Sequence, residues 1–111
     1  MTIKELAESG KFQVINLGAD LDRLITKPFC CDLLSIAMGK APAGSAWVTV
    51  MGNMNTLAVA ALADVSCVVM AEGAELDEVA TKKAGEQEIT VLAVEEPIFE
   101  AAQMIDRMLH G

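Results

Sequence analysis

The sequence predicts a single α/β domain over residues 1–111, arranged in three layers, with a mostly parallel sheet of about four to five strands flanked by helices. A chain of 111 residues has the usual length of one domain. Apolar, β-branched runs alternate with helical patterns along most of it. Strands that alternate with helices form mostly parallel sheets with helices on their faces.

The central unit runs from Ser45 to Gly73. Trp47–Met51 is apolar and contains β-branched residues, so it is predicted to be a strand. A polar loop follows, and Leu57–Ala63 then carries apolar residues on every face, which predicts a buried helix. Cys67–Ala71 is a second apolar strand. The unit is therefore βαβ, and its loop lies where α/β proteins usually bind ligands.

Two helices, a strand and a segment over residues 21–31 that is extended at least in part, because Pro28 keeps Lys27 out of the helical region, are predicted before the central unit. Thr2 and Glu5 have the spacing of a capping box, which starts the first helix. A strand is predicted over Phe12–Ile15. Asp32 is predicted to cap a short helix that ends at Gly39.

Three elements are predicted after the central unit. Apolar residues at helical spacing indicate a helix from about Leu76 to Ala84, and Ile89–Val94 is an apolar strand. Pro97 fits the first turn of the last helix.

Composition limits the class of function. The chain is 53% hydrophobic and 22% charged, with a net charge of −8. An acidic surface repels phosphate groups, so we expect neither nucleic acid nor a membrane as a partner. No apolar run reaches the ~18–20 residues of a membrane span. The amino-terminal residues lack a signal-peptide pattern, and the cysteine count is odd, so we expect a cytoplasmic protein with free thiols.

The loop from Gly52 to Thr56 is the first candidate ligand site. Free amides at a helix amino terminus, together with Asn and Thr side chains, favour an anion or a polar small molecule. The alternative is that Asn53 or Asn55 simply caps the helix. The candidate ligand-binding residues are Arg23, Thr26, Gly52, Asn53, Asn55 and Thr56.

Groups for catalysis or metal binding are scarce. His110 is the single histidine and stands next to the last residue, which leaves no triad of nucleophile, base and acid in the body of the fold. Cys30, Cys31 and Cys67 lack the spacing of a metal site. Dinucleotide and Walker motifs are absent. We therefore predict no enzymatic activity, no catalytic residues, no metal and no cofactor.

The residues also resemble a known family. LDRLIT, CDLLSIAMG and AWVTVMGNMNTLAVAALADVSCVVMAEG are similar to the DRTGG domain, above all at Asp22-Arg23, Thr26, residues 32–35 and the helix that starts at Asn55. DRTGG domains resemble the N-terminal domain of HPr kinase/phosphorylase and also occur beside CBS domains in regulated pyrophosphatases. The resemblance implies a regulatory or dimer-forming module and no catalytic role.

Two functions from different classes follow. The first is a non-catalytic regulatory or interaction module that forms a homodimer, with a further protein partner possible. The alternative is a small-ligand sensor that binds a nucleotide or another anion at Gly52–Thr56, helped by Arg23 and Thr26. The kinase activity itself is not expected, because the sequence has no phosphate-binding loop of that enzyme.

Overall fold

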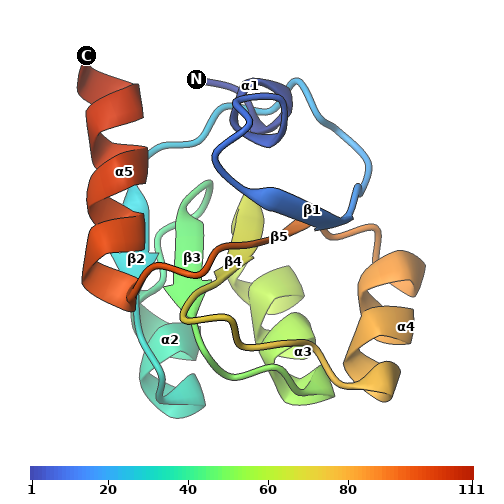
Figure 1. Ribbon diagram of the computed structural model, residues 1–111. Coiled ribbons are helices and arrows are strands. Elements are labelled where there is room, and N and C mark those ends of the chain that lie inside the picture. Colours follow the sequence, from blue (N-terminus) through green and yellow to red (C-terminus); the bar gives the residue numbers. More distant parts are fainter.

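The computed structural model describes residues 1–111 as five helices and five strands, in the predicted order (Figure 1). No helix has the length and the apolar character that crossing a membrane requires. The elements are α1 (Ile3–Ala7), β1 (Gln13–Asn16), β2 (Pro28–Cys30), α2 (Leu34–Lys40), β3 (Ala46–Thr49), α3 (Met54–Ala63), β4 (Cys67–Met70), α4 (Glu78–Glu86), β5 (Val91–Ala93) and α5 (Ile98–His110).

The five strands form one sheet in the order β1-β5-β4-β3-β2. Strands β2 to β5 are parallel, and β1 pairs antiparallel with β5 at one edge. The mostly parallel sheet is as the sequence predicts. Along the parallel part, each strand lies beside the strand that precedes it in the chain. The chain therefore adds strands in one direction across the sheet from β2 to β5, including the step from β3 to β4.

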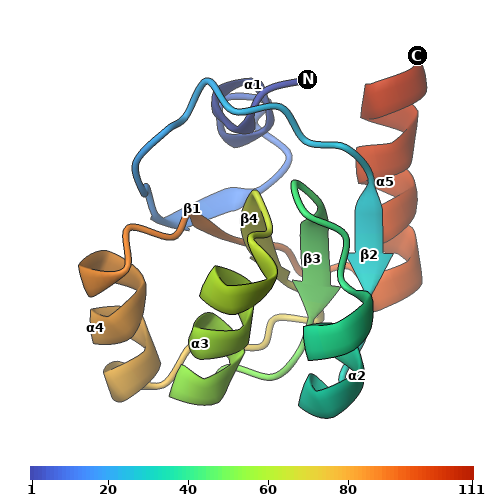
Figure 2. The ribbon, with the colours of Figure 1, turned by 180° about the vertical axis from the view of Figure 1, so that it is seen from behind.

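Helices cover both faces of the sheet, which gives the predicted three layers (Figures 1 and 2). Successive residues of a strand point to opposite faces. In β3, Val48 packs into the core beneath α1 and α5, whereas Trp47 packs into the core beneath α2, α3 and α4. Both side chains are fully buried. The completely buried strands β3 and β4 explain why their sequences are continuous apolar runs.

Side-chain caps start three of the helices. Thr2 and Glu5 form the predicted capping box at α1. Asn53 caps α3, since its Oδ1 accepts hydrogen bonds from the amides of Asn55 and Thr56 at 2.9 and 3.2 Å. Asp77 caps α4 in the same way, accepting from the amide of Ala80 at 2.7 Å. These caps satisfy amides that would otherwise have no partner in the first turn.

The predicted cap of α2 is wrong. Leu33, not Asp32, occupies the position before the helix, and Gly39 lies inside the helix instead of ending it. The carboxylate of Asp32 accepts hydrogen bonds from Thr49 Oγ1 at 2.7 Å and from the Val50 amide at 3.1 Å. Two donors at the end of β3 hold this carboxylate, so it is not available to the amides in the first turn of α2.

The prediction of a helix buried on every face is also wrong in part. Leu57 of α3 is fully buried, but Leu62 is 73% exposed and Met54 is 48% exposed. Helix α3 lies between α2 and α4 in one layer on the sheet (Figure 2). One of its sides therefore faces the sheet, and the opposite side faces away from it. The apolar residues on its other side remain open to solvent.

Cys67 gives the fold a predicted pH dependence. Complete burial raises the pKa of this thiol from 9.0 to about 12. Above about pH 9, the unfolded chain releases this proton while the folded chain keeps it, so the free energy of unfolding falls by up to about 1.4 kcal/mol per pH unit. Urea unfolding at about pH 8 and about pH 10.5 measures the decrease. Cys67→Ala is expected to reduce it, and an unchanged decrease in that variant would contradict the assignment.

Candidate functional site

The six candidate ligand-binding residues do not converge on one site. Gly52, Asn53, Asn55 and Thr56 follow β3 and lie at the carboxyl edge of the parallel strands. Arg23 and Thr26 precede β2, which runs parallel to β3, so they lie at the opposite edge. A small ligand at the Gly52 loop therefore cannot also contact Arg23 or Thr26.

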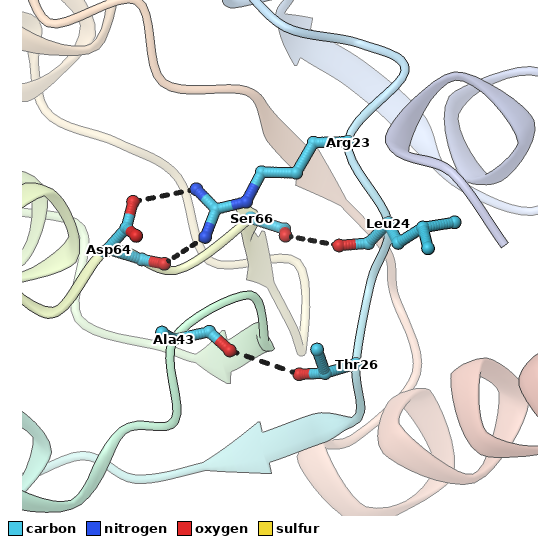
Figure 3. A network of polar contacts seen from close by, with 6 residues as sticks. All are labelled: Arg23, Leu24, Thr26, Ala43, Asp64 and Ser66. Carbon is cyan, nitrogen blue, oxygen red and sulfur yellow. Dashed lines mark hydrogen bonds and ion pairs between the residues drawn. The ribbon is translucent and has the colours of Figure 1, made fainter.

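Arg23 and Thr26 bind other parts of the chain at that amino edge (Figure 3). The Arg23 guanidinium donates to Asp64 Oδ1 and to the Asp64 carbonyl oxygen, each at 2.8 Å. Asp64 ends α3 with a left-handed backbone (φ 60°). Thr26 Oγ1 donates to the Ala43 carbonyl at 3.3 Å, and the neighbouring Ser66 Oγ donates to the Leu24 carbonyl at 2.9 Å. These contacts fasten residues 23–26 to the loops that precede β3 and β4.

The side chains of the Gly52 loop are largely engaged within the protein. The cap formed by Asn53 occupies the amides of Asn55 and Thr56. Thr56 is buried, and its hydroxyl donates to the Met51 carbonyl at 2.7 Å. The Asn55 side chain makes no hydrogen bond and is exposed. Of the two possible caps, the structure thus uses Asn53.

Gly52 is required by a close approach of backbone. A β-carbon at this position would lie 2.0 Å from the Glu75 carbonyl oxygen. The Gly52 carbonyl also accepts from the Asp77 amide at 2.8 Å. The loop before α4 therefore covers Gly52, where a ligand was predicted to bind.

The Asp32 carboxylate already supplies a negative charge next to this loop. It accepts from the Val50 amide, and Thr49 Oγ1 accepts from the Met51 amide at 3.3 Å. An incoming anion would meet amides that already have acceptors, and a carboxylate that repels it.

A hollow lies further along the same edge. It is a cavity of about 630 Å³ at the carboxyl ends of β4 and β5, beside the start of β1. It was not predicted from the sequence, although Gly73 and Glu95 each follow a predicted strand and so marked the same edge. We call it the edge cavity. It is lined by residues 10–13, 73–76 and 93–96, together with Ile15, Met70 and Thr81.

The reactive side chains lie apart from this cavity. His110 is exposed at the end of α5, where its Nδ1 lies 3.2 Å from Asp106 Oδ1. Burial raises the pKa of Cys30, and the nearby Asp32 carboxylate adds to the effect. Cys31 lies close to Cys30, and its Sγ donates to the Leu33 carbonyl at 3.3 Å. No group of three His, Cys, Asp or Glu residues is placed to hold a metal ion.

The fold and the edge cavity define a small three-layer α/β domain with one antiparallel edge strand. The family model for the DRTGG domain matches residues 13–108, and the chain belongs to the DRTGG domain family. The resemblance predicted from the sequence is thereby confirmed. No curated protein matches the sequence.

The fold is shared with solved structures. One of them contains the CBS and DRTGG domains of the regulatory region of Clostridium perfringens pyrophosphatase, complexed with the activator diadenosine tetraphosphate. The TM-score is 0.75 at 13% sequence identity, over 94% of this chain and 45% of that chain. The DRTGG domain is thus part of a regulatory region in this neighbour, and our chain spans less than half of the neighbour's length.

Proposed function

We propose that the chain is a non-catalytic regulatory domain that acts by pairing with a second copy of itself. The observation that carries this proposal is an uncharged, apolar surface formed by the outward sides of α2 and α3. We call it the α2–α3 face. It consists of Leu33, Ile36, Met38, Met54 and Leu62, each between 48% and 73% exposed.

Charge sets the α2–α3 face apart from the rest of the molecule. Helix α3 has no charged residue, and α2 has only Lys40 at its end. The neighbouring α4 instead carries Glu78, Lys82 and Glu86 on exposed positions. Water does not hydrate apolar side chains favourably, so five exposed large apolar residues at two neighbouring helices mark a surface that a partner covers.

A second copy suits this face better than a charged partner does. Each chain has a net charge of −8, so two copies repel one another across most of their surfaces. Only an uncharged region allows close contact without bringing carboxylates together. A two-fold interface places the same patch on both sides, and an apolar patch is complementary to itself.

The regulatory part of the proposal is supported by the neighbour, in which a DRTGG domain belongs to a regulatory region. The non-catalytic part is supported by the positions of the titratable groups. His110 is at the far end of α5, and the Cys67 thiol is buried with a pKa of about 12, so neither group is available as a base or nucleophile near the edge cavity.

A nucleotide or anion sensor remains the second candidate, because the neighbour was crystallised with a dinucleotide activator. The exposed Asn55 side chain is the free polar group of the Gly52 loop. If the loop binds diadenosine tetraphosphate, titration calorimetry will show heat that Asn55→Ala reduces. The geometry assigns Arg23 and Thr26 no part in that binding.

Analytical ultracentrifugation tests self-association. We expect wild-type protein at micromolar concentration to sediment with about twice the 11.7 kDa mass of the chain. Leu62→Asp is expected to weaken the dimer at least about 100-fold, because the two-fold interface would bury two unpaired carboxylates.

The matched control is Val79→Asp. Val79 is an apolar residue of α4 with 58% exposure, but it lies among charged residues and outside the α2–α3 face. We expect this variant to dimerise like the wild type. A wild-type monomer at high micromolar concentration, or equal loss in both variants, would refute the proposed interface.

A further inference from the structure

We propose that the edge cavity binds a small organic molecule that has an apolar body and a positively charged amine. The inference does not depend on self-association, because the cavity lies at β1, β4 and β5, away from the α2–α3 face. It also differs from the nucleotide or anion expected at the Gly52 loop, both in position and in the charge of the ligand.

The strand order explains why a hollow forms here. From β2 to β5, each connection carries the chain one strand further in the same direction, with α2, α3 and α4 all on one face. After β5 the chain crosses to the other face and forms α5 (Figure 1). The strand beyond β5 is β1, which comes from the other end of the chain. Open α/β sheets bind ligands outside the carboxyl ends of their parallel strands, and here the loops after β4 and β5 lead to helices on opposite faces of the sheet.

The size and the floor of the cavity suit an apolar body. Its volume of about 630 Å³ lies within the ~300–1,000 Å³ of small-molecule sites. Met70, Leu76 and Val94 contribute apolar atoms from β4, the loop before α4 and the end of β5. Phe12 does so from the segment before β1. Met70, Phe12 and Val94 are already buried against the core and form a fixed apolar floor. The half-buried Leu76 instead offers apolar atoms that a ligand would remove from water.

The rim carries more negative than positive charge. Glu75, Glu95 and Glu96 line the cavity, and Lys11 is the single basic residue among its lining residues. The Arg23–Asp64 salt bridge and the Asp106–His110 contact involve none of them. These carboxylates are therefore free to pair with an ammonium group. Opposite charges at about 4 Å attract one another, more strongly in a partly enclosed site than in bulk water, and the same carboxylates would repel a phosphate.

The carboxylate of Glu95 lies over the backbone of the cavity wall at Gly73. Gly73 has φ +70°, and a β-carbon there would lie 2.5 Å from Glu95 Oε2. Two backbone hydrogen bonds join the loops that form the wall. The amide of Glu72 donates to the carbonyl of Glu96 at 2.9 Å, and the amide of Gly73 donates to the carbonyl of Val94 at 3.1 Å. The loops after β4 and β5 thus form a pre-arranged pair of walls, which lowers the entropy cost of binding.

Three probes that share one apolar body test the charge preference. They are phenethylamine, phenethyl alcohol and phenylacetate, which differ in carrying a positive charge, no charge and a negative charge. Binding is followed by ¹H–¹⁵N NMR of the full chain at physiological salt. We expect phenethylamine to shift the amides of Gly10 and Gly73, which line the cavity, and to leave those of Gly39 and Gly85, in α2 and α4, unchanged.

Charge removal locates the site. The double variant Glu75→Gln, Glu95→Gln is expected to weaken phenethylamine binding about tenfold and to leave phenethyl alcohol binding unchanged. The matched control, Glu86→Gln with Glu100→Gln, removes two exposed carboxylates outside the cavity lining and is expected to bind like the wild type. All four substitutions are at exposed positions, and the glycine amide shifts of the free proteins report whether each variant is folded.

Several results would overturn the proposal. One is the absence of shifts with phenethylamine at millimolar concentration. A second is binding of phenylacetate as tight as that of phenethylamine. A third is an equal loss of binding in the control, which would mean that the amine responds only to the overall negative charge of the protein.

Discussion

Gly52→Ala is expected to lower the free energy of unfolding by about 3 kcal/mol, because the new methyl group has no space. Its carbon would lie 2.0 Å from the Glu75 carbonyl oxygen and 3.1 Å from the Leu76 Cα. Both neighbours are backbone atoms, so no side-chain rotation relieves the contact. The two loops must separate, which also weakens the 2.8 Å bond from the Asp77 amide to the Gly52 carbonyl.

Two other glycines provide matched controls. At Gly39 in α2 and Gly85 in α4, an added methyl carbon would have no neighbouring atom within 4 Å. Alanine at either helical position is expected to stabilise the protein by about 0.5–1 kcal/mol. Urea unfolding followed by the fluorescence of Trp47, the single tryptophan, measures all three variants. A Gly52→Ala protein as stable as the wild type would show that the two loops do not approach one another so closely.

Leu57→Ala is expected to lower the free energy of unfolding by about 3–4 kcal/mol. The Leu57 side chain is fully buried between α3 and the sheet, and its truncation leaves a cavity in a densely packed core. Leu62, in the same helix, is 73% exposed, so Leu62→Ala is expected to change the stability of the monomer by less than about 0.5 kcal/mol.

The two leucine variants separate folding from association. At low protein concentration, urea unfolding should distinguish Leu57→Ala from the wild type but not Leu62→Ala. At high concentration, Leu62→Ala should weaken self-association, which reveals the second role of α3. If Leu62→Ala instead destabilises the monomer as much as Leu57→Ala does, Leu62 belongs to the core and the α2–α3 face is not a free surface.

Most of the fold could be predicted from the sequence because its signals are local. The capping box at Thr2, the apolar strand around Val48 and the periodicity of α5 depend on neighbouring residues alone. The side on which α3 is exposed could not be predicted, since residues 57–63 are apolar throughout and carry no periodic pattern. That side is determined by α2 and α4, which lie next to α3 in space.

The candidate site was harder to predict because its geometry is non-local. Asp32 has the residue type and spacing of a helix cap, yet it binds Thr49 and Val50, which lie at the end of another strand. Gly52 belongs to the loop that was predicted to bind a ligand, but the backbone of Glu75 lies against it. The edge cavity depends on β1 lying beside β5, and strand adjacency is not encoded in the spacing of residues.

The pairing of β1 with β5 has a consequence for synthesis on the ribosome. Gln13 lies opposite Ala93 and Val14 opposite Leu92, and no other strand accepts β1. Within the domain, β1 leaves the exit tunnel before the other strands and must therefore wait for β5 before it finds its place. At about 5–20 residues per second, that interval is several seconds. Strands β2, β3 and β4 can assemble in order meanwhile, so β1 docks onto the sheet after them, once β5 has emerged.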